Sequence, residues 1–540
     1  MDENKKFEEI VNKGIDEYFK RNPRIAVMFG KEEYEKEVES GTKEHIEENL
    51  TWFGKWIDEL KQLDIEKLNF ENQISLKAME YYHNINLFKH KEFPLWRKYP
   101  NGLDYFQEIV YLLFQRKGPT TDLAETIIIH IRNLPKYLEE FQSRFNNTPI
   151  PIVWRDLALD TIQATIKIFK TVTEAYNETS DVNNSLKNRL LETFKEAESV
   201  IQSHVKWIKS LPVDTDEFAW ALGPEKLDKL LSLRKLPWDR KTLISKGNKL
   251  FSSRFKKIRQ ILKELYPNKN LSERIKEFFK EDLIPTFQEV LEYTQSEAER
   301  AKEFIKNHDL ATIPQTKLVI IETPPHIVPI LPGAAYVPAP YFKREQPGIF
   351  MISPTLKEQQ SYTYISFWMV HEAYPGHHLD FANNNAFTPL IRLLGYAYET
   401  IEGWAHYCEE MMLQEGFYKD HKKSQHLIVG TQMAITMTML LDIQLHCKQR
   451  SIKDATETLM NILSFEESAA KAAVVDYTRG PSYPLSYLSG KLLIDDLRKE
   501  VEEKMGDKFS LKFFHDTILR SGDLPYYLLK EYFEEKLKDL

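Results

Sequence analysis

The segment His371–His378 reads His-Glu-Ala-Tyr-Pro-Gly-His-His and carries the residue types of a hydrolytic metal site. Neutral imidazoles and carboxylates are good ligands for Zn²⁺. In the shorter His-Glu-x-x-His motif, the Glu lies beside the metal-bound water without binding the metal. We therefore expect His371 to bind a metal ion and Glu372 to act as the general base.

The second ligand is not fixed by this spacing. On a regular helix, position 375 would share the face of His371, but that position is Pro375. His378 returns to nearly the same face after two turns, at a rise of about 10.5 Å. His377 requires a local distortion, which Pro375 and Gly376 can supply. We favour His377 as the ligand and keep His378 as the alternative.

A third ligand is expected in the segment 399–409. Glu402 follows His377 by 25 positions, enough for a helix, a turn and the start of an antiparallel helix. Glu399, Glu402, His406 and Glu409 share one helical face, as a ligand and its hydrogen-bonding partners would. The ordinary alternative is a solvated helix face.

Candidates for substrate contacts lie between residues 476 and 487. A tetrahedral oxyanion needs a donor such as a tyrosine hydroxyl, and we assign this role first to Tyr487 and then to Tyr483. Arg479 is a candidate for binding a substrate carboxylate in bidentate fashion. The alternatives are packed tyrosines and an arginine in a surface ion pair.

The elements that must position these residues are mainly helical. Apolar residues recur at three- and four-residue spacing over 1–308, with breakers such as Asn22-Pro23 and Pro224 between the helices. Nine prolines between Pro314 and Pro354 exclude a long helix there, and the runs 317–321 and 348–352 predict strands. This β-insert is either an edge strand for substrate pairing or a structural crossover.

The predicted fold is mainly α and two-lobed, with a helical region over 1–308, and the β-insert and a catalytic helical region over 309–540. The net charge of −8 and the absence of a long basic run argue against nucleic acid. Two cysteines exclude a disulfide framework. The N-terminus lacks a continuous apolar stretch, and no membrane span is expected. We predict a cytoplasmic protein.

Several motifs together resemble the domain-of-unknown-function family 885 (DUF885). They include the eight-residue metal motif, Glu402-Gly403-Trp404-Ala405-x-Tyr407-x-Glu409 and Pro484-Leu485-Ser486-Tyr487-x-x-Gly490. Upstream, Tyr336, Pro338 and Pro340 are similar to the stretch that precedes the metal motif in that family. We assign Tyr336 to substrate binding on this ground.

The family is distantly similar to thimet-type oligopeptidases and Taq-type carboxypeptidases, which are helical zinc peptidases. Their Gly-His within the metal motif and a Glu about 25 residues later match Gly376-His377 and Glu402. The resemblance implies one Zn²⁺ per chain and hydrolysis of short peptides by metal-activated water, as a carboxypeptidase or an oligopeptidase. A site of two His and one Glu also accepts Co²⁺ or Mn²⁺. The alternatives are a metal-dependent amidase acting on a non-peptide amide, and a non-catalytic helical scaffold with a relict site.

Overall fold

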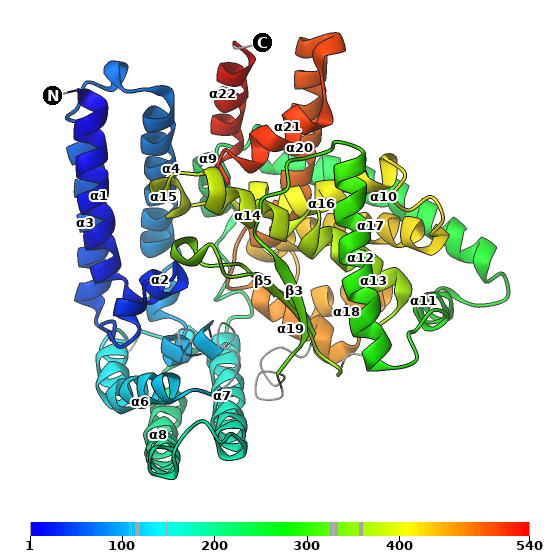
Figure 1. Cartoon of the computed structure of the whole chain (residues 1–540). Helices are drawn as coiled ribbons and strands as arrows, with labels where there is room; N and C mark the ends of the chain where they lie inside the picture. The colour runs from blue at the N-terminus through cyan, green and yellow to red at the C-terminus, as the bar shows by residue number, and fades with distance from the viewer. Residues whose placement is uncertain are drawn as a thin grey trace. The chain divides into compact units, whose positions relative to one another are not determined.

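The computed structural model describes residues 2–106, 109, 111–113, 119–146, 148–324, 328, 333–355 and 360–538. Within these ranges the chain is mainly α-helical with a small three-stranded sheet, which confirms the predicted class (Figure 1). Contacts group the chain into two compact units. Unit 1 comprises Met1–Leu76, Asn86–Trp220 and Thr323–Arg344, and unit 2 comprises Lys77–Ile85, Ala221–Glu322 and Glu345–Leu540. The expected boundary near residue 308 is a single cut, whereas this division is discontinuous in sequence.

Unit 1 consists of long helices from the first two fifths of the chain, together with three short strands. Residues 77–85 of its fourth helix group with unit 2. The elements are α1 (Glu3–Arg21), α2 (Pro23–Met28), α3 (Lys43–Leu60), α4 (Phe70–Glu92), α6 (Thr121–Gln142), α7 (Ile152–Glu178), α8 (Asn184–Ser210), β1 (Ile150–Pro151), β2 (Val213–Asp214) and β4 (Ala334–Val337).

Unit 2 holds the C-terminal helices, two strands and all the predicted metal-site residues. Its elements are α9 (Pro224–Leu233), α10 (Arg240–Leu265), α11 (Leu271–Lys280), α12 (Phe287–Asn307), β3 (Leu318–Glu322), β5 (Gly348–Ile352), α13 (Tyr362–Trp368), the turn η7 (Met369–Ala373), α14 (His377–Phe387), α15 (Leu390–Leu393), α16 (Tyr398–Gln414), α17 (Lys422–His446), α18 (Ile452–Leu463), α19 (Glu467–Tyr477), α20 (Tyr483–Met505), α21 (Leu511–Leu519) and α22 (Tyr526–Leu537).

Local sequence determines where these helices begin. Pro23 and Pro224 each open a helix, as their fixed φ and missing N–H allow at the first position. At α12 the Thr286 side chain accepts from the Glu289 amide while the Glu289 carboxylate accepts from the Thr286 amide. This reciprocal cap satisfies two N–H groups that have no partner inside the helix.

The β-insert contains the predicted strands. β3 and β5 pair in parallel, with Leu318 opposite Gly348 and Glu322 opposite Ile352. β5 is almost entirely buried, and its Phe350 ring lies 6.4 Å from the Trp368 ring at the end of α13. The insert therefore packs against the helix that leads into the metal motif. Pairing of a substrate with β3 stays a prediction.

One helix, α17, is long and apolar enough to cross a membrane by length and composition, with a mean hydropathy of 1.3 over its most apolar window. However, 72% of that window is buried inside the structure. It packs against α10, α13, α18 and α20. These contacts are those of a core helix.

Candidate metal centre

The first half of the motif lies on a π-helical turn. α13 continues into η7, which carries His371 and Glu372, and Met369 and Val370 on this turn are buried. A π turn adds a residue to a helical turn and is often found at functional sites. It changes the direction in which His371 projects relative to a regular helix.

Gly376 allows the chain to fold back onto this turn. Its amide donates to the Val370 carbonyl at 3.0 Å, and a Cβ on it would lie 1.7 Å from the His371 carbonyl oxygen. Because that neighbour is backbone, no side chain can be accommodated. α14 begins at the next residue, and the His377 ring centroid lies 5.0 Å from that of His371.

α16 brings Glu402 to the two imidazoles. The Trp404 indole N–H donates to the Pro375 carbonyl at 2.9 Å, which ties α16 to the fold-back. The Oε2 atom of Glu402 lies 3.9 Å from Nε2 of His377. One ligand atom each from His371, His377 and Glu402 lie within 4.8 Å of one another. The structure thus brings together the three residues favoured as ligands.

His378, the alternative ligand, has other partners. It is buried, and its Nε2 lies 3.1 Å from the Tyr374 hydroxyl. Burial lowers the pKa of His378 to about 4, although a hydrogen bond with the Thr316 backbone opposes that shift. The candidate metal groups among the described residues include His377 and not His378.

Glu409 connects His371 to a third imidazole. Its fully buried carboxylate accepts from Nδ1 of His371 at 2.7 Å and from Nδ1 of His406 at 2.8 Å. Burial opposes both charges, but these contacts prevail: they raise the pKa of His371 to about 9 and lower that of Glu409 to about 2. Such a carboxylate orients a metal-binding imidazole, and an ion at Nε2 would displace the second proton of His371 while Nδ1 stays the donor to Glu409.

His371, His406 and Glu409 also form a group compact enough to hold an ion. Its N···O separations of 2.7 and 2.8 Å are those of hydrogen bonds, so protons already join these atoms. The 3.9 Å between His377 and Glu402 is too long for a hydrogen bond. An ion therefore fits better among His371, His377 and Glu402.

This donor set fits zinc. Two imidazoles and one carboxylate are a common catalytic zinc set, and neighbouring ligands of a tetrahedral ion lie about 3.3 Å apart. Shifts of about 1 Å would bring these three side chains to that spacing. Burial, with the charges of His371 and His406, lowers the pKa of His377 well below its usual value, so its imidazole is neutral as a ligand must be. Its buried Nδ1 has no hydrogen-bond partner among the described residues.

Glu372 lies within reach of the charges of this centre. Burial raises the pKa of its carboxyl, His371 opposes the shift, and Glu402 adds to it. Its carboxylate makes no hydrogen bond to any part of the chain that the structure describes. A carboxylate with a raised pKa and open lone pairs is suited to accept a proton from water.

Both predicted tyrosines lie at the centre. The Tyr483 hydroxyl donates to Oε1 of Glu402 at 2.9 Å. The Tyr487 ring packs edge-on against His406, with centroids 5.5 Å apart, and against Tyr483 at 5.4 Å. Burial raises the pKa of both hydroxyls, so both are protonated donors near neutral pH.

The close approach of α16 and α20 depends on two glycines. A Cβ on Gly403 would lie 2.4 Å from the Gly490 carbonyl carbon, and one on Gly490 would lie 2.0 Å from the Glu399 carbonyl oxygen. Helix backbones in direct contact leave no room for side chains. This contact sets Tyr483 beside Glu402.

Two further predicted substrate contacts, Arg479 and Tyr336, lie outside α16 and α20. Arg479 follows the end of α19 by two residues and forms an ion pair with Asp476 in the last turn of that helix. Tyr336 lies in β4, which groups with unit 1. Their roles in substrate binding stay predictions.

The sequence did not predict the buried charged residues that bind the backbone at the start of α20. Glu399, expected on the same face as Glu402, instead pairs with Arg234 at 2.6 Å. Arg234 also donates to the Ser482 carbonyl, and Asp442 accepts from the Ser482 and Leu485 amides at 3.2 Å each. Asp442 is an acidic residue inside the apolar helix α17. Its position in an apolar sequence was the feature that could have predicted a buried charge with fixed partners.

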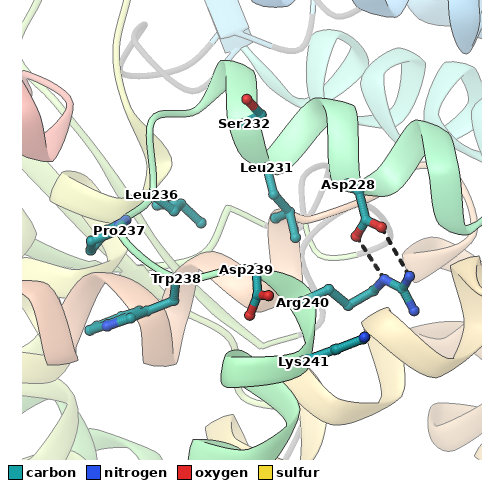
Figure 2. A pocket seen from close by; sticks show the side chains of 9 residues that line it. All are labelled: Asp228, Leu231, Ser232, Leu236, Pro237, Trp238, Asp239, Arg240 and Lys241. Atoms are coloured by element: carbon teal, nitrogen blue, oxygen red, sulfur yellow. Dashed lines mark hydrogen bonds and ion pairs between the residues drawn. The ribbon is translucent and has the colours of Figure 1, made fainter.

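A separate hollow of about 270 Å³ lies at the turn between α9 and α10 (Figure 2). Its polar groups bind one another: Arg240 donates to both carboxylate oxygens of Asp228, and Asp239 caps α10 through the Thr242 amide at 2.8 Å. These hydrogen bonds stabilise the turn. The side chains that form them are therefore engaged with one another and not free to bind a ligand.

Two solved structures share the fold of this chain. One, from Colwellia psychrerythraea and described as a "putative lipoprotein", has a TM-score of 0.86 and 18% identity over 100% of both chains. The other, from Shewanella oneidensis and described as a "putative lipoprotein of unknown function", has a TM-score of 0.77 and 18% identity over 98% of this chain and 99% of the other. No curated protein matches the chain.

These descriptions contradict the predicted cytoplasmic location, and that prediction is wrong on this comparison. It relied on the lack of an apolar N-terminal stretch. A lipoprotein is held at a membrane by a covalently attached lipid, which leaves no apolar helix in the folded domain. The amino-acid composition of the folded domain therefore does not distinguish a lipoprotein from a cytoplasmic protein.

The family resemblance inferred from the motifs is confirmed over almost the whole chain. The model of the family described as "Bacterial protein of unknown function (DUF885)" matches residues 23–532, a range that includes every residue of the candidate metal centre. The chain belongs to the DUF885 family.

Proposed function

We propose that this protein is a metal-dependent hydrolase that cleaves amide bonds in short peptides. The observation that carries the proposal is the convergence of His371, His377 and Glu402 within 4.8 Å, with Glu372 beside them. The mainly helical fold and the spacing of Gly376-His377 and Glu402 favour a relationship to helical zinc peptidases. The descriptions of the two structural neighbours favour action at the cell envelope.

A zinc ion held by His371, His377 and Glu402 would polarise the scissile carbonyl and make water acidic enough to attack near neutral pH. Glu372 would accept a proton from the attacking water and deliver it to the leaving amine. Glu409 holds the His371 imidazole in one tautomer, with Nδ1 as the donor.

The tyrosines act on the substrate oxygen. The Tyr487 hydroxyl is the first candidate donor to the oxyanion. Tyr483 holds Glu402 through its 2.9 Å hydrogen bond, so it orients that ligand and becomes a donor to substrate only if it rotates away. Arg479 would leave Asp476 to bind a substrate carboxylate.

Metal binding tests the ligand set. Zinc content of the purified chain, measured by elemental analysis after dialysis, should be close to one ion per chain. His377→Ala should lose the ion, whereas the matched variant His378→Ala should keep it, because His378 bonds to Tyr374 instead. Equal zinc content in both variants, or none in the unmodified protein, would reject this centre.

Turnover tests the reaction. A peptide-library digest followed by mass spectrometry should show cleavage products with the zinc-loaded protein. Glu372→Gln should retain zinc and lose at least about a hundredfold in rate, since it removes the proton acceptor. Cleavage of N-acyl amino acids but not of peptides would favour the amidase alternative, and zinc binding without any hydrolysis would favour the scaffold.

A further inference from the structure

A second, apolar pocket lies in unit 2, and none of the metal ligands lines it. It has a volume of about 260 Å³ and is formed by α10, α11, α13, α17 and the end of α18. α17 contacts α10, α13 and α18, and α10 contacts α11. Phe255 and Ile258 from α10, Phe278 from α11 and Met433 from α17 are typical of the lining. A pocket of this size accommodates one chain or ring, because sites for larger ligands exceed about 300 Å³.

Gly430 keeps this pocket open. It lies in the middle of the 25-residue helix α17, where glycine costs about 1 kcal/mol relative to alanine. Other glycines in the helices of this unit, such as Gly403 and Gly490, sit against neighbouring backbone. A Cβ on Gly430 would meet nothing within 4 Å, so close packing does not require a glycine here. The missing side chain instead leaves space in the lining.

Polar groups on the lining are few. The Thr431 hydroxyl already donates to the Leu427 carbonyl at 3.1 Å. The Nδ1 atom of His426 is buried and has no hydrogen-bond partner among the residues described. His426 lies one turn from Gly430 on the same face of α17, so a ligand in the pocket can bring a polar end to it.

Positive charge lies near His426. Burial lowers the pKa of His426, Lys422 and Lys257 lower it further, and Glu264 opposes them. Neither lysine forms an ion pair within the described part of the chain, whereas Glu264 already accepts from Gln260 at 2.9 Å. Both lysines are exposed; Lys422 lies one turn before His426 on α17, and Lys257 precedes the lining residue Ile258 on α10. An anionic group at the His426 end of the pocket would therefore meet one open imidazole nitrogen and the field of these two unpaired cations.

We propose that this pocket binds an alkyl carboxylate of medium chain length, with the chain beside Gly430 and the carboxylate near His426, Lys257 and Lys422. The apolar lining excludes a polar chain, and the unpaired lysines select an anion over a neutral head group. The proposal does not depend on the proposed catalysis, because none of these residues belongs to the metal centre; Phe367 of the lining stacks on His371, with ring centroids 6.1 Å apart.

Calorimetric titration of the full chain with hexanoate and octanoate tests this site. Each added methylene should tighten binding about fourfold until the pocket is full. Gly430→Leu should weaken octanoate binding at least tenfold by filling the space, and Gly430→Ala should stay within about threefold of the unmodified chain. Both variants should unfold at or above its melting temperature, because they improve the helix.

Charge is tested separately. The double variant Lys257→Gln, Lys422→Gln should lose affinity for octanoate and keep its affinity for 1-octanol. Equal binding of octanoate and 1-octanol by the unmodified chain would overturn the assignment of an anionic head group. Absence of octanoate binding, or unchanged binding by Gly430→Leu, would overturn the site.

Discussion

Glu409 carries a full charge in the interior, with none of its surface exposed, and two imidazoles account for it. A buried carboxylate is costly unless charged hydrogen bonds compensate it. Here His371 and His406 both donate to its Oε1 atom. These hydrogen bonds therefore fix the His371 ring. The orientation of this metal ligand is set by Glu409, a residue that does not bind the ion.

Replacing Glu409 with glutamine should weaken zinc binding 10- to 100-fold, since the neutral amide cannot fix both imidazoles as the carboxylate does. Competition with a chromophoric zinc chelator measures the change. Glu410→Gln is the matched control, because the adjacent Glu410 pairs with Lys491 at 2.6 Å and does not contact His371. Equal affinities of the two variants would show that Glu409 does not orient the ligand.

Residue types and spacing were sufficient to predict His371, His377 and Glu402 as one cluster. The choice of His377 over His378 followed from Pro375 and Gly376, and the structure gives the reason in the contact between Gly376 and the His371 backbone. The partner of Glu399 was not predictable, because Arg234 lies 165 positions earlier in the chain. Helical periodicity predicts which side chains share one face of a helix, but it does not predict which residues of other elements contact that face.

At the scale of elements, the contact between α16 and α20 positions half of the centre. Gly490→Ala should destabilise unit 2 by about 3 kcal/mol or more, because the new methyl would meet the Glu399 carbonyl oxygen at 2.0 Å and the two backbones must separate. Urea-induced unfolding measures the loss.

Gly430→Ala provides the matched control for this substitution. It makes the same chemical change inside a helix, but its Cβ meets nothing, so stability should rise by about 1 kcal/mol. If both variants lost stability equally, the effect would come from helix backbone alone and not from the packing of α16 on α20.

The sequence pattern predicted where helices and strands lie better than it predicted local departures from regular geometry. The predicted strands at 317–321 and 348–352 correspond to β3 and β5 within one residue. The π turn at Met369–Ala373 was not predicted, because its apolar residues fit a regular helix equally well and only the contacts of the next loop distinguish the two. The grouping of Thr323–Arg344 with unit 1 likewise depends on tertiary contacts.

At the scale of the whole molecule, buried ionisable groups oppose one another in their response to pH. Burial lowers the pKa of His446 to about 4 and that of His515 to about 3, so both destabilise the fold as pH falls below about 6.5. Burial raises the pKa of Asp442 to about 7 and also raises that of Asp523, so protonation of both carboxyls stabilises the fold as pH falls. The net acid response is the difference between these contributions.

Asp523 and Asp380 respond to pH as one buried pair. The Asn384 amide donates to Asp523 at 2.8 Å and to Asp380 at 3.2 Å, so this amide joins two buried carboxyls. Burial raises the pKa of both carboxyls above the unfolded value of about 3.9, so the folded pair binds more protons than the unfolded chain above that pH. Ionisation of this pair therefore penalises the fold at pH 8, and the penalty falls towards pH 5. Asp523→Asn keeps the shape and tolerates the φ of 50° at this position. It should be more stable than the unmodified chain at pH 8 and lose that advantage at pH 5, as denaturant unfolding at the two pH values would reveal. A constant difference between the two proteins would mean that Asp523 does not titrate in this range.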